Sequence, residues 1–188
     1  MDKIPTRQEA YALLTEYNEN EALIKHALAV EGVMRHFAAL KGEDIEFWGM
    51  VGLLHDLDYE KFPQEHCVKV VEILRNHDID ESVIYAIASH GYQICSDIKP
   101  KHLMEKILYT IDELTGLINA AALMRPSKSV MDLEYKSLWK KYKTANFAAG
   151  VDRAIIERGC EMWEADLKEV IEECIKGMRV VAKEIGLG

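Results

Sequence analysis

The stretch "LLHDLDYEKF", residues 53–62, brings several ionisable side chains together where an apolar segment meets a polar one. His55 and Asp56 directly follow two leucines, and Asp58 and Lys61 come within the next five residues. Burying a charge is costly unless it is paired or bound to a metal. Taken alone, the stretch fits two explanations: a hydrogen-bonded His-Asp pair in front of an exposed loop, or part of a metal site.

Three further histidines favour the metal site. His26, His66 and His90 each share the helical spacing of the apolar residues around them, so we expect all three to point inward. One inward histidine is more often a core residue with a hydrogen-bond partner than a ligand. Several of them near His55 and Asp56 favour a shared ion, because otherwise each buried imidazole needs a separate partner.

Asp112 supplies a matching carboxylate in "MEKILYTIDELTGLINAA". The residues one turn before it are apolar, and Gly116 one turn later leaves room on that side. The alternative, in which Asp112 and Glu113 both face solvent, is less favoured because "ILYTI" leaves little polar face. Imidazole and carboxylate together suit Fe, Mn, Zn, Ni or Co better than Mg or Ca. We therefore predict one or two divalent transition-metal ions.

The elements that must position these residues are helices nearly throughout, since no alternating run of useful length occurs. Prolines fall between the apolar periodic segments, where they are tolerated. Asn20 is a suitable N-cap, and Gly42 a suitable stop, for the longest early helix. The fold class predicted is all-α, a compact bundle forming a single domain over 1–188. The expected helices are 5–17, 21–41, 43–55, 64–77, 80–90, 100–124, 131–143, 151–163 and 165–185.

Charge and composition limit the kinds of molecule that the protein is expected to bind. The 188 residues suffice for one domain with a sizeable core. With 23 Lys and Arg against 32 Asp and Glu, the net charge is −9, which disfavours a nucleic acid polymer as partner. A small phosphorylated substrate held by a few local cations remains compatible. The sequence leaves the oligomeric state open.

Localisation is expected to be cytoplasmic. "MDKIPTRQEA" has no apolar signal region, and "FWGMVGLL" is too short to span a bilayer, so no membrane partner is expected. The cysteines at 67, 95, 160 and 174 are widely spaced without a C-x-x-C motif. We expect reduced, free thiols and no cysteine zinc site.

The order His26, then His55-Asp56, then Asp112 resembles the pattern of the HD-domain superfamily of metal-dependent phosphohydrolases. The resemblance covers roughly residues 20–125. It implies an all-helical domain whose central helices converge on a divalent metal, with these four side chains as ligands. Within the superfamily, the whole sequence more closely resembles an uncharacterised group of bacterial and archaeal predicted HD superfamily hydrolases, which adds no substrate.

Members of the superfamily that hold two metals insert further histidines between the HD pair and the last aspartate. His66 and His90 fall in that interval, as in the branch that includes bacterial symmetrical dinucleoside-tetraphosphate hydrolases. The resemblance therefore favours two ions, with Asp56 bridging them. In the alternative, one ion is bound, and His66 and His90 contact its ligands or the substrate.

The catalytic residues suggested are Asp56, Asp58 and Lys61. Asp58 is a candidate proton donor to the leaving group, as is Glu60, although both also fit an exposed loop. Many relatives read H-D-I-G-K, whereas "HDLDYEK" puts Asp58 in place of the glycine and Lys61 two positions late, so a lysine role does not transfer directly.

The predicted phosphate-binding residues are Arg125 and Lys128 in "RPSKS", soon after the helix that carries Asp112. The alternative for this segment is a surface turn. The function predicted is a metal-dependent phosphohydrolase of a small phosphate ester, favouring a nucleotide. A di-iron oxygenase with the same ligands is one alternative, and a non-catalytic metal- or nucleotide-binding signalling module is another.

Overall fold

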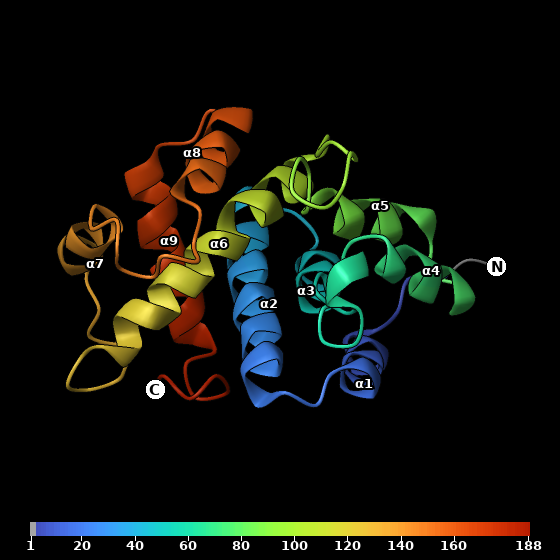
Figure 1. The fold of residues 1–188 in the computed structure, drawn as a ribbon, viewed down its shortest axis with the longest axis horizontal. Coiled ribbons are helices and arrows are strands. Elements are labelled where there is room, and N and C mark those ends of the chain that lie inside the picture. Colours follow the sequence, from blue (N-terminus) through green and yellow to red (C-terminus); the bar gives the residue numbers. More distant parts are fainter. Residues whose placement is uncertain (1–2) are drawn as a thin grey trace.

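The computed structural model describes residues 3–188, and its regular structure over that range is helical (Figure 1). This confirms the all-α prediction. Outside the helices, the described part contains only two isolated bridges, between Lys3 and Ile79 and between Tyr92 and Ser96. The helices are α1 (Arg7–Tyr17), α2 (Glu21–Lys41), α3 (Ile45–Leu54), the short 3-10 helix η1 (Pro63–Glu65), α4 (Lys69–Asn76), α5 (Glu81–Ser89), α6 (Leu103–Leu123), α7 (Tyr135–Tyr142), α8 (Arg153–Met162) and α9 (Leu167–Val180).

Two long helices, α2 and α6, cross at the centre of the molecule and organise the rest. On one side α3 packs against α2, and α1 and α5 pack in turn against α3. On the other side α8 and α9 cover α6 and α2, and α7 lies beyond them. The C-terminal third therefore packs on the helices that carry His26 and Asp112, and one hydrophobic core runs through the whole bundle.

Local sequence explains where the central helices begin and end. The Asn20 side chain accepts a hydrogen bond from Ala22 N at 2.9 Å, and α2 stops at Gly42, whose φ of 71° lies in the left-handed region. Asp44 caps α3 by accepting hydrogen bonds from the backbone N–H groups of Glu46 and Phe47. Since α3 is buried along almost its whole length, its end can deliver the HD pair into the interior.

The segment expected as one helix over 64–77 is instead divided. The 3-10 helix η1 is followed by a turn, and α4 begins only at Lys69. His66 has an extended ψ of 142°, and Cys67 has a φ of 67°, so neither residue continues a helix. His66 therefore lies in a turn and not on the face of α4 that carries Val70 and Ile73.

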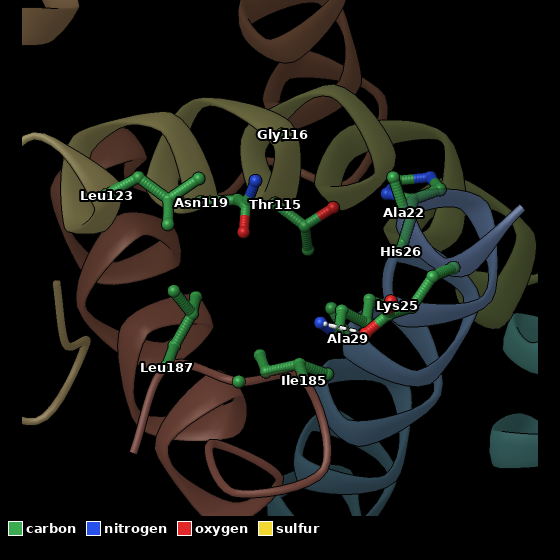
Figure 2. Close-up of a pocket in the computed structure, with 12 residues that line it drawn as sticks. Ala22, Lys25, His26, Ala29, Thr115, Gly116, Asn119, Leu123, Ile185 and Leu187 are labelled. Carbon is green, nitrogen blue, oxygen red and sulfur yellow. Dashed lines mark ion pairs between the residues drawn. The ribbon is translucent and has the colours of Figure 1, made fainter.

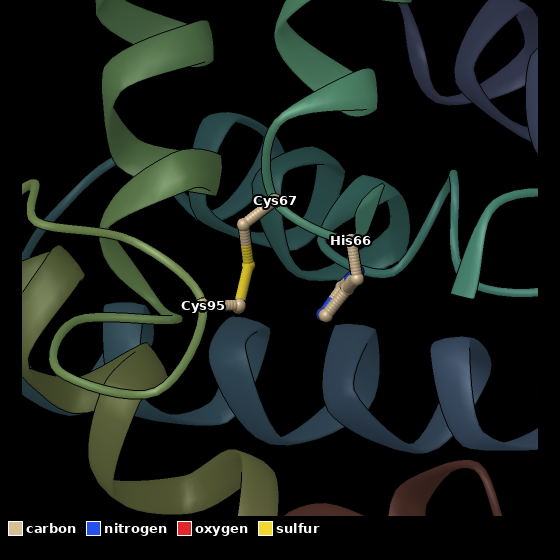
Figure 3. A group of neighbouring side chains, drawn as sticks. All are labelled: His66, Cys67 and Cys95. Atoms are coloured by element: carbon tan, nitrogen blue, oxygen red, sulfur yellow. A yellow bond between two sulfur atoms is a disulfide. The ribbon is translucent and has the colours of Figure 1, made fainter. Parts of the chain in front are cut away.

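A second difference concerns the cysteines. Cys67 and Cys95 form a disulfide across 28 residues of sequence, with their Cα atoms 5.9 Å apart (Figure 3). The prediction of free thiols was wrong for this pair, because α4 and α5 fold back and bring the two segments together. Cys160 and Cys174 are free and buried, as expected. Within residues 3–188, no helix combines the length and the apolar character needed to cross a membrane.

Candidate metal centre

Three helices bring the four residues of the H…HD…D pattern to one point. His26 comes from α2, His55 and Asp56 from the end of α3, and Asp112 from the middle of α6. His26 Nε2 lies 3.0 Å from Asp112 Oδ1 and 3.2 Å from His55 Nε2. His55 Nε2 in turn lies 3.3 Å from both Asp56 Oδ2 and Asp112 Oδ1. We call this group of four the first ligand set.

The spacing of the first ligand set fits a common ion. Five of the six distances between its ligand atoms run from 3.0 to 3.5 Å. A tetrahedron with metal–ligand bonds of about 2.0–2.1 Å has edges of about 3.3–3.4 Å, and an octahedron about 2.9 Å. These five distances match the edges that one divalent transition-metal ion requires, and all four ligand atoms lie within 4.8 Å of one another.

A second ligand set lies on the other oxygen of Asp56. His66 Nε2 and His90 Nε2 each lie 3.4 Å from Asp56 Oδ1, whereas Oδ2 faces the first set. The three residues have ligand atoms close enough to share an ion. Asp56 thus presents one oxygen to each set, which is the arrangement expected of a bridging carboxylate.

The backbone fixes the orientation of two of the imidazoles. His55 Nδ1 donates to Gly52 O at 2.7 Å, and His90 Nδ1 donates to Ile87 O at 2.5 Å. Because a carbonyl oxygen can only accept, Nδ1 carries a proton in each ring, and Nε2 is the nitrogen that faces the centre and would bind an ion once it is deprotonated. Both histidines lie just past the end of a helix, where the last carbonyl oxygens lack their i+4 helical partner.

Asp58 fixes the third imidazole. Its carboxylate is fully buried, accepts a hydrogen bond from His66 Nδ1 at 2.7 Å and another from Val70 N at 2.8 Å. This places a charged acceptor behind a ligand histidine, an arrangement that orients the ring and raises its basicity. The structure therefore gives Asp58 a positioning contact with His66, where the sequence suggested a proton donor to the leaving group.

The charges of the two sets are coupled. Burial opposes protonation of His55, but Asp56 and Asp112 outweigh it and raise the pKa of His55 well above its ordinary value. Burial likewise opposes ionisation of the two aspartates, and His55 outweighs it, so the pKa of each carboxyl is lowered. Both carboxyl groups are therefore ionised at neutral pH, as metal ligands must be.

A cavity of about 370 Å³ opens onto both ligand sets and gives a substrate access. Its wall includes Tyr59, which is 45% exposed and meets the His66 ring edge-on, with ring centroids 5.2 Å apart. It also includes Tyr109, whose hydroxyl accepts a hydrogen bond from Arg158 Nη1 at 3.1 Å. The other lining residues outside the ligand sets are Gly91, Ile94, Cys95, Glu113, Gly116, Val151 and Ile155.

Sequence reasoning missed two of these residues. Tyr59 lies beside the HD pair, but nothing in its type or spacing marked it as part of a cavity wall. Arg158 lies 46 positions after Asp112 and reaches Tyr109 only because α8 packs on α6. Tyr109 itself carried a signal, since it stands one turn before Asp112 on the same helix.

The remaining predicted site residues lie elsewhere. Lys61 donates to Glu16 O at 2.7 Å and covers the Tyr17 ring, so it faces the end of α1. Glu60, the other proton-donor candidate, accepts hydrogen bonds from the backbone N–H groups of Glu19 and Asn20. None of these four contacts brings Lys61 or Glu60 to the metal centre.

Arg125 and Lys128 are also not brought to the centre. Arg125 makes a two-pronged ion pair with Asp132 at 2.8 and 3.0 Å, and Lys128 is exposed. Asp112 and Arg125 are 13 residues apart along and just beyond α6, which at 1.5 Å per residue corresponds to roughly 20 Å. The expectation rested on proximity in sequence, and the length of the helix separates the two places in space.

Comparisons with known proteins match the part of the chain that carries both ligand sets. The family model described as HD domain matches residues 23–117, slightly more than half of the chain. Ribonuclease Y from Clostridium botulinum strains Hall and Langeland is 26% identical over 178 residues, which cover 91% of this chain and 32% of each relative. The chain thus spans about a third of the length of these curated relatives. No solved structure matches the chain significantly.

Proposed function

This chain belongs to the HD domain family, a family of metal-dependent phosphohydrolases, and we propose that it hydrolyses the phosphate ester of a small nucleotide. The observation that carries the proposal is the position of Asp56. Its two oxygens face two separate groups of imidazoles, as in a centre that holds two ions. Two ions about 3.5–4 Å apart suit displacement at phosphorus, because one can serve the attacking oxygen and the other the leaving oxygen.

The residues of the chain supply the frame for this reaction. Bound divalent ions lower the pKa of a coordinated water and neutralise charge on a phosphate. His26, His55 and Asp112 would hold one ion, and His66 and His90 the other, with Asp56 shared. The first set offers four protein ligands and the second only three, so the second leaves more positions for substrate and water.

The acidic lining of the cavity at the metal centre favours a small substrate over a long nucleic acid. Its lining contains Asp56, Asp112 and Glu113 but neither lysine nor arginine, and the chain as a whole carries a net charge of −9. Long nucleic acids bind through many lysine and arginine contacts to phosphates. The name of the relatives makes a phosphodiester in RNA the second candidate, and the assay below includes it.

The test is a metal analysis followed by a substrate screen. Protein purified without added metal is analysed for Fe, Mn, Zn, Ni and Co, and then assayed on p-nitrophenyl phosphate, bis-p-nitrophenyl phosphate, nucleoside monophosphates, dinucleotides and a short oligoribonucleotide. We expect metal-dependent release of phosphate or nucleotide from one of the small esters. Dioxygen uptake with an iron-loaded protein and no ester hydrolysis would favour the oxygenase instead.

The matched variants are Asp56→Asn and His77→Gln. The first removes a ligand charge from both sets and is expected to abolish metal binding and hydrolysis together. The second changes a histidine at the end of α4, outside both ligand sets, and is expected to keep both. Hydrolysis that survives Asp56→Asn at the wild-type rate would contradict the proposal.

A further inference from the structure

A second cavity adjoins the metal centre and is not used by the chemistry described above. It has a volume of about 430 Å³, within the range of sites that bind drug-sized molecules. Its walls come from the beginning of α2, the second half of α6 and the C-terminal residues 185–187 (Figure 2). The three elements are brought together by the packing of α9 on α2 and α6.

The two cavities meet at His26 and Gly116, which line both of them. A Cβ on Gly116 would make one ordinary contact, with Val151 Cγ2 at 3.7 Å, so the glycine leaves room for a small side chain here. His26 belongs to the first ligand set. Because both cavities are lined by His26, a molecule whose phosphate lies at the metal centre has the second cavity directly beside it.

The lining of the second cavity is mostly apolar and carries little free charge. Lys25 is paired with Glu21 at 2.6 Å, and the Thr115 hydroxyl donates to Asp112 O at 2.7 Å. The amide of Asn119 makes no hydrogen bond within residues 3–188, so both its donor and its acceptor are available. The apolar lining residues are Ala22, Ala29, Leu123, Ile185 and Leu187.

We propose that this cavity, which we call the nucleoside cavity, binds the nucleoside part of the substrate. The inference rests on the proposed function, because the phosphate is taken to lie at the metal centre. Alkyl side chains on opposite walls suit the flat faces of a base, and one free amide suits its edge, which carries both donors and acceptors. A second phosphate is disfavoured here, since Lys25 in the lining is already paired with Glu21.

The first test uses adenosine, which has no phosphate, as the probe. Binding is measured by NMR titration on wild-type protein and on two variants that fill the cavity from opposite walls, Ala22→Trp and Asn119→Phe. Both positions are exposed, so the fold should tolerate them, and circular dichroism checks this. Leu40→Trp places the same large side chain at an exposed position near the other end of α2, outside both cavities, and is the control.

We expect adenosine to bind wild type and Leu40→Trp equally, and each cavity variant at least tenfold more weakly. Equal binding to folded cavity variants and wild type, or no binding to wild type, would overturn the inference. A parallel arm compares hydrolysis of p-nitrophenyl phosphate, adenosine monophosphate and an adenosine dinucleotide. In the cavity variants, KM for the two nucleotides should rise at least tenfold more than KM for p-nitrophenyl phosphate. The nucleotide with the higher kcat/KM shows whether the nucleoside belongs to a mononucleotide or to a dinucleotide.

The two failures are distinguishable. If no ester is hydrolysed, but adenosine binds and the two cavity variants weaken its binding, the proposed function fails and the cavity assignment stands. If esters are hydrolysed and the cavity variants leave both adenosine binding and nucleotide KM unchanged, the proposed function stands and the nucleoside lies elsewhere.

Discussion

Replacing Asp58 with asparagine should weaken the binding of the metal ion at His66 and His90, and leave the binding of the ion at the first ligand set nearly unchanged. In the native protein the buried carboxylate accepts from both His66 Nδ1 and Val70 N. Asparagine keeps one acceptor oxygen and adds an NH2 group, so two donors compete for one acceptor. The conflict is relieved if His66 moves its proton to Nε2 and accepts at Nδ1, but then Nε2 loses the lone pair that binds the ion.

Two magnitudes follow from these contacts. Loss of a partner that supports a ligand histidine typically costs about 10–100-fold in metal affinity, or about 1.4–2.8 kcal/mol. Leaving a buried donor unsatisfied costs about 1–3 kcal/mol of folding stability. For a chain of this length that corresponds to a melting temperature lowered by roughly 2–12 °C.

The assay is a titration of metal-free protein with Co²⁺ by isothermal calorimetry, with metal content measured after desalting. Asp58→Asn should show a nearly unchanged first affinity and a second affinity weakened about 10–100-fold. Asp80→Asn is the control, since Asp80 caps α5 away from the centre and asparagine is an equally good cap. A variant that binds the second ion as tightly as wild type, or loses both ions equally, would refute the selective role of Asp58.

The remaining predictions concern metal content, stability and the role of Arg125. The His66→Ala, His90→Ala double variant should bind one ion where wild type binds two, and one ion in both proteins would mean that these histidines have another task. Chelation should lower the melting temperature, because free metal at 100 times its Kd stabilises by about 2.7 kcal/mol, or roughly 5–11 °C for this size; an unchanged melting temperature after verified metal removal would contradict the linkage. Arg125→Ala should leave KM and kcat unchanged and should be matched by Asp132→Ala, since each breaks the same surface pair; a raised KM for Arg125→Ala alone would restore its phosphate role.

Much of the fold was predictable because caps and apolar periodicity agree with tertiary packing. Asn20 and Gly42 bound α2 where the sequence placed its ends. The predicted helix over 64–77 was wrong because the hydrogen bond between His66 and Asp58 and the left-handed backbone of Cys67 cannot be recognised from a helical pattern of apolar residues. His66 nevertheless points inward, as expected, but it does so from a turn held by Asp58.

The site was predictable in part for the same kind of reason. Order in the sequence and inward phase selected the five imidazole and carboxylate residues that meet around Asp56. Helix phase explains this for His26 and Asp112, whereas His66 was selected from a predicted helix that is in fact a turn. The role of Asp58 and the positions of Lys61 and Arg125 depend on how loops meet other elements, and neighbours in sequence do not determine that. The proximity of Cys67 and Cys95 likewise depends on how distant segments pack, and their neighbours in sequence do not reveal it.

The most direct test of the account is to locate the ions. Crystals of protein loaded with Co²⁺ or Mn²⁺, measured at the absorption edge of the metal, give an anomalous difference map. We predict two peaks about 3.5–4 Å apart, one among His26, His55 and Asp112 and the other at His66 and His90, with Asp56 between them. A fully loaded crystal with no peak at these residues, or with one ion and both His66 and His90 unbound, would contradict the account.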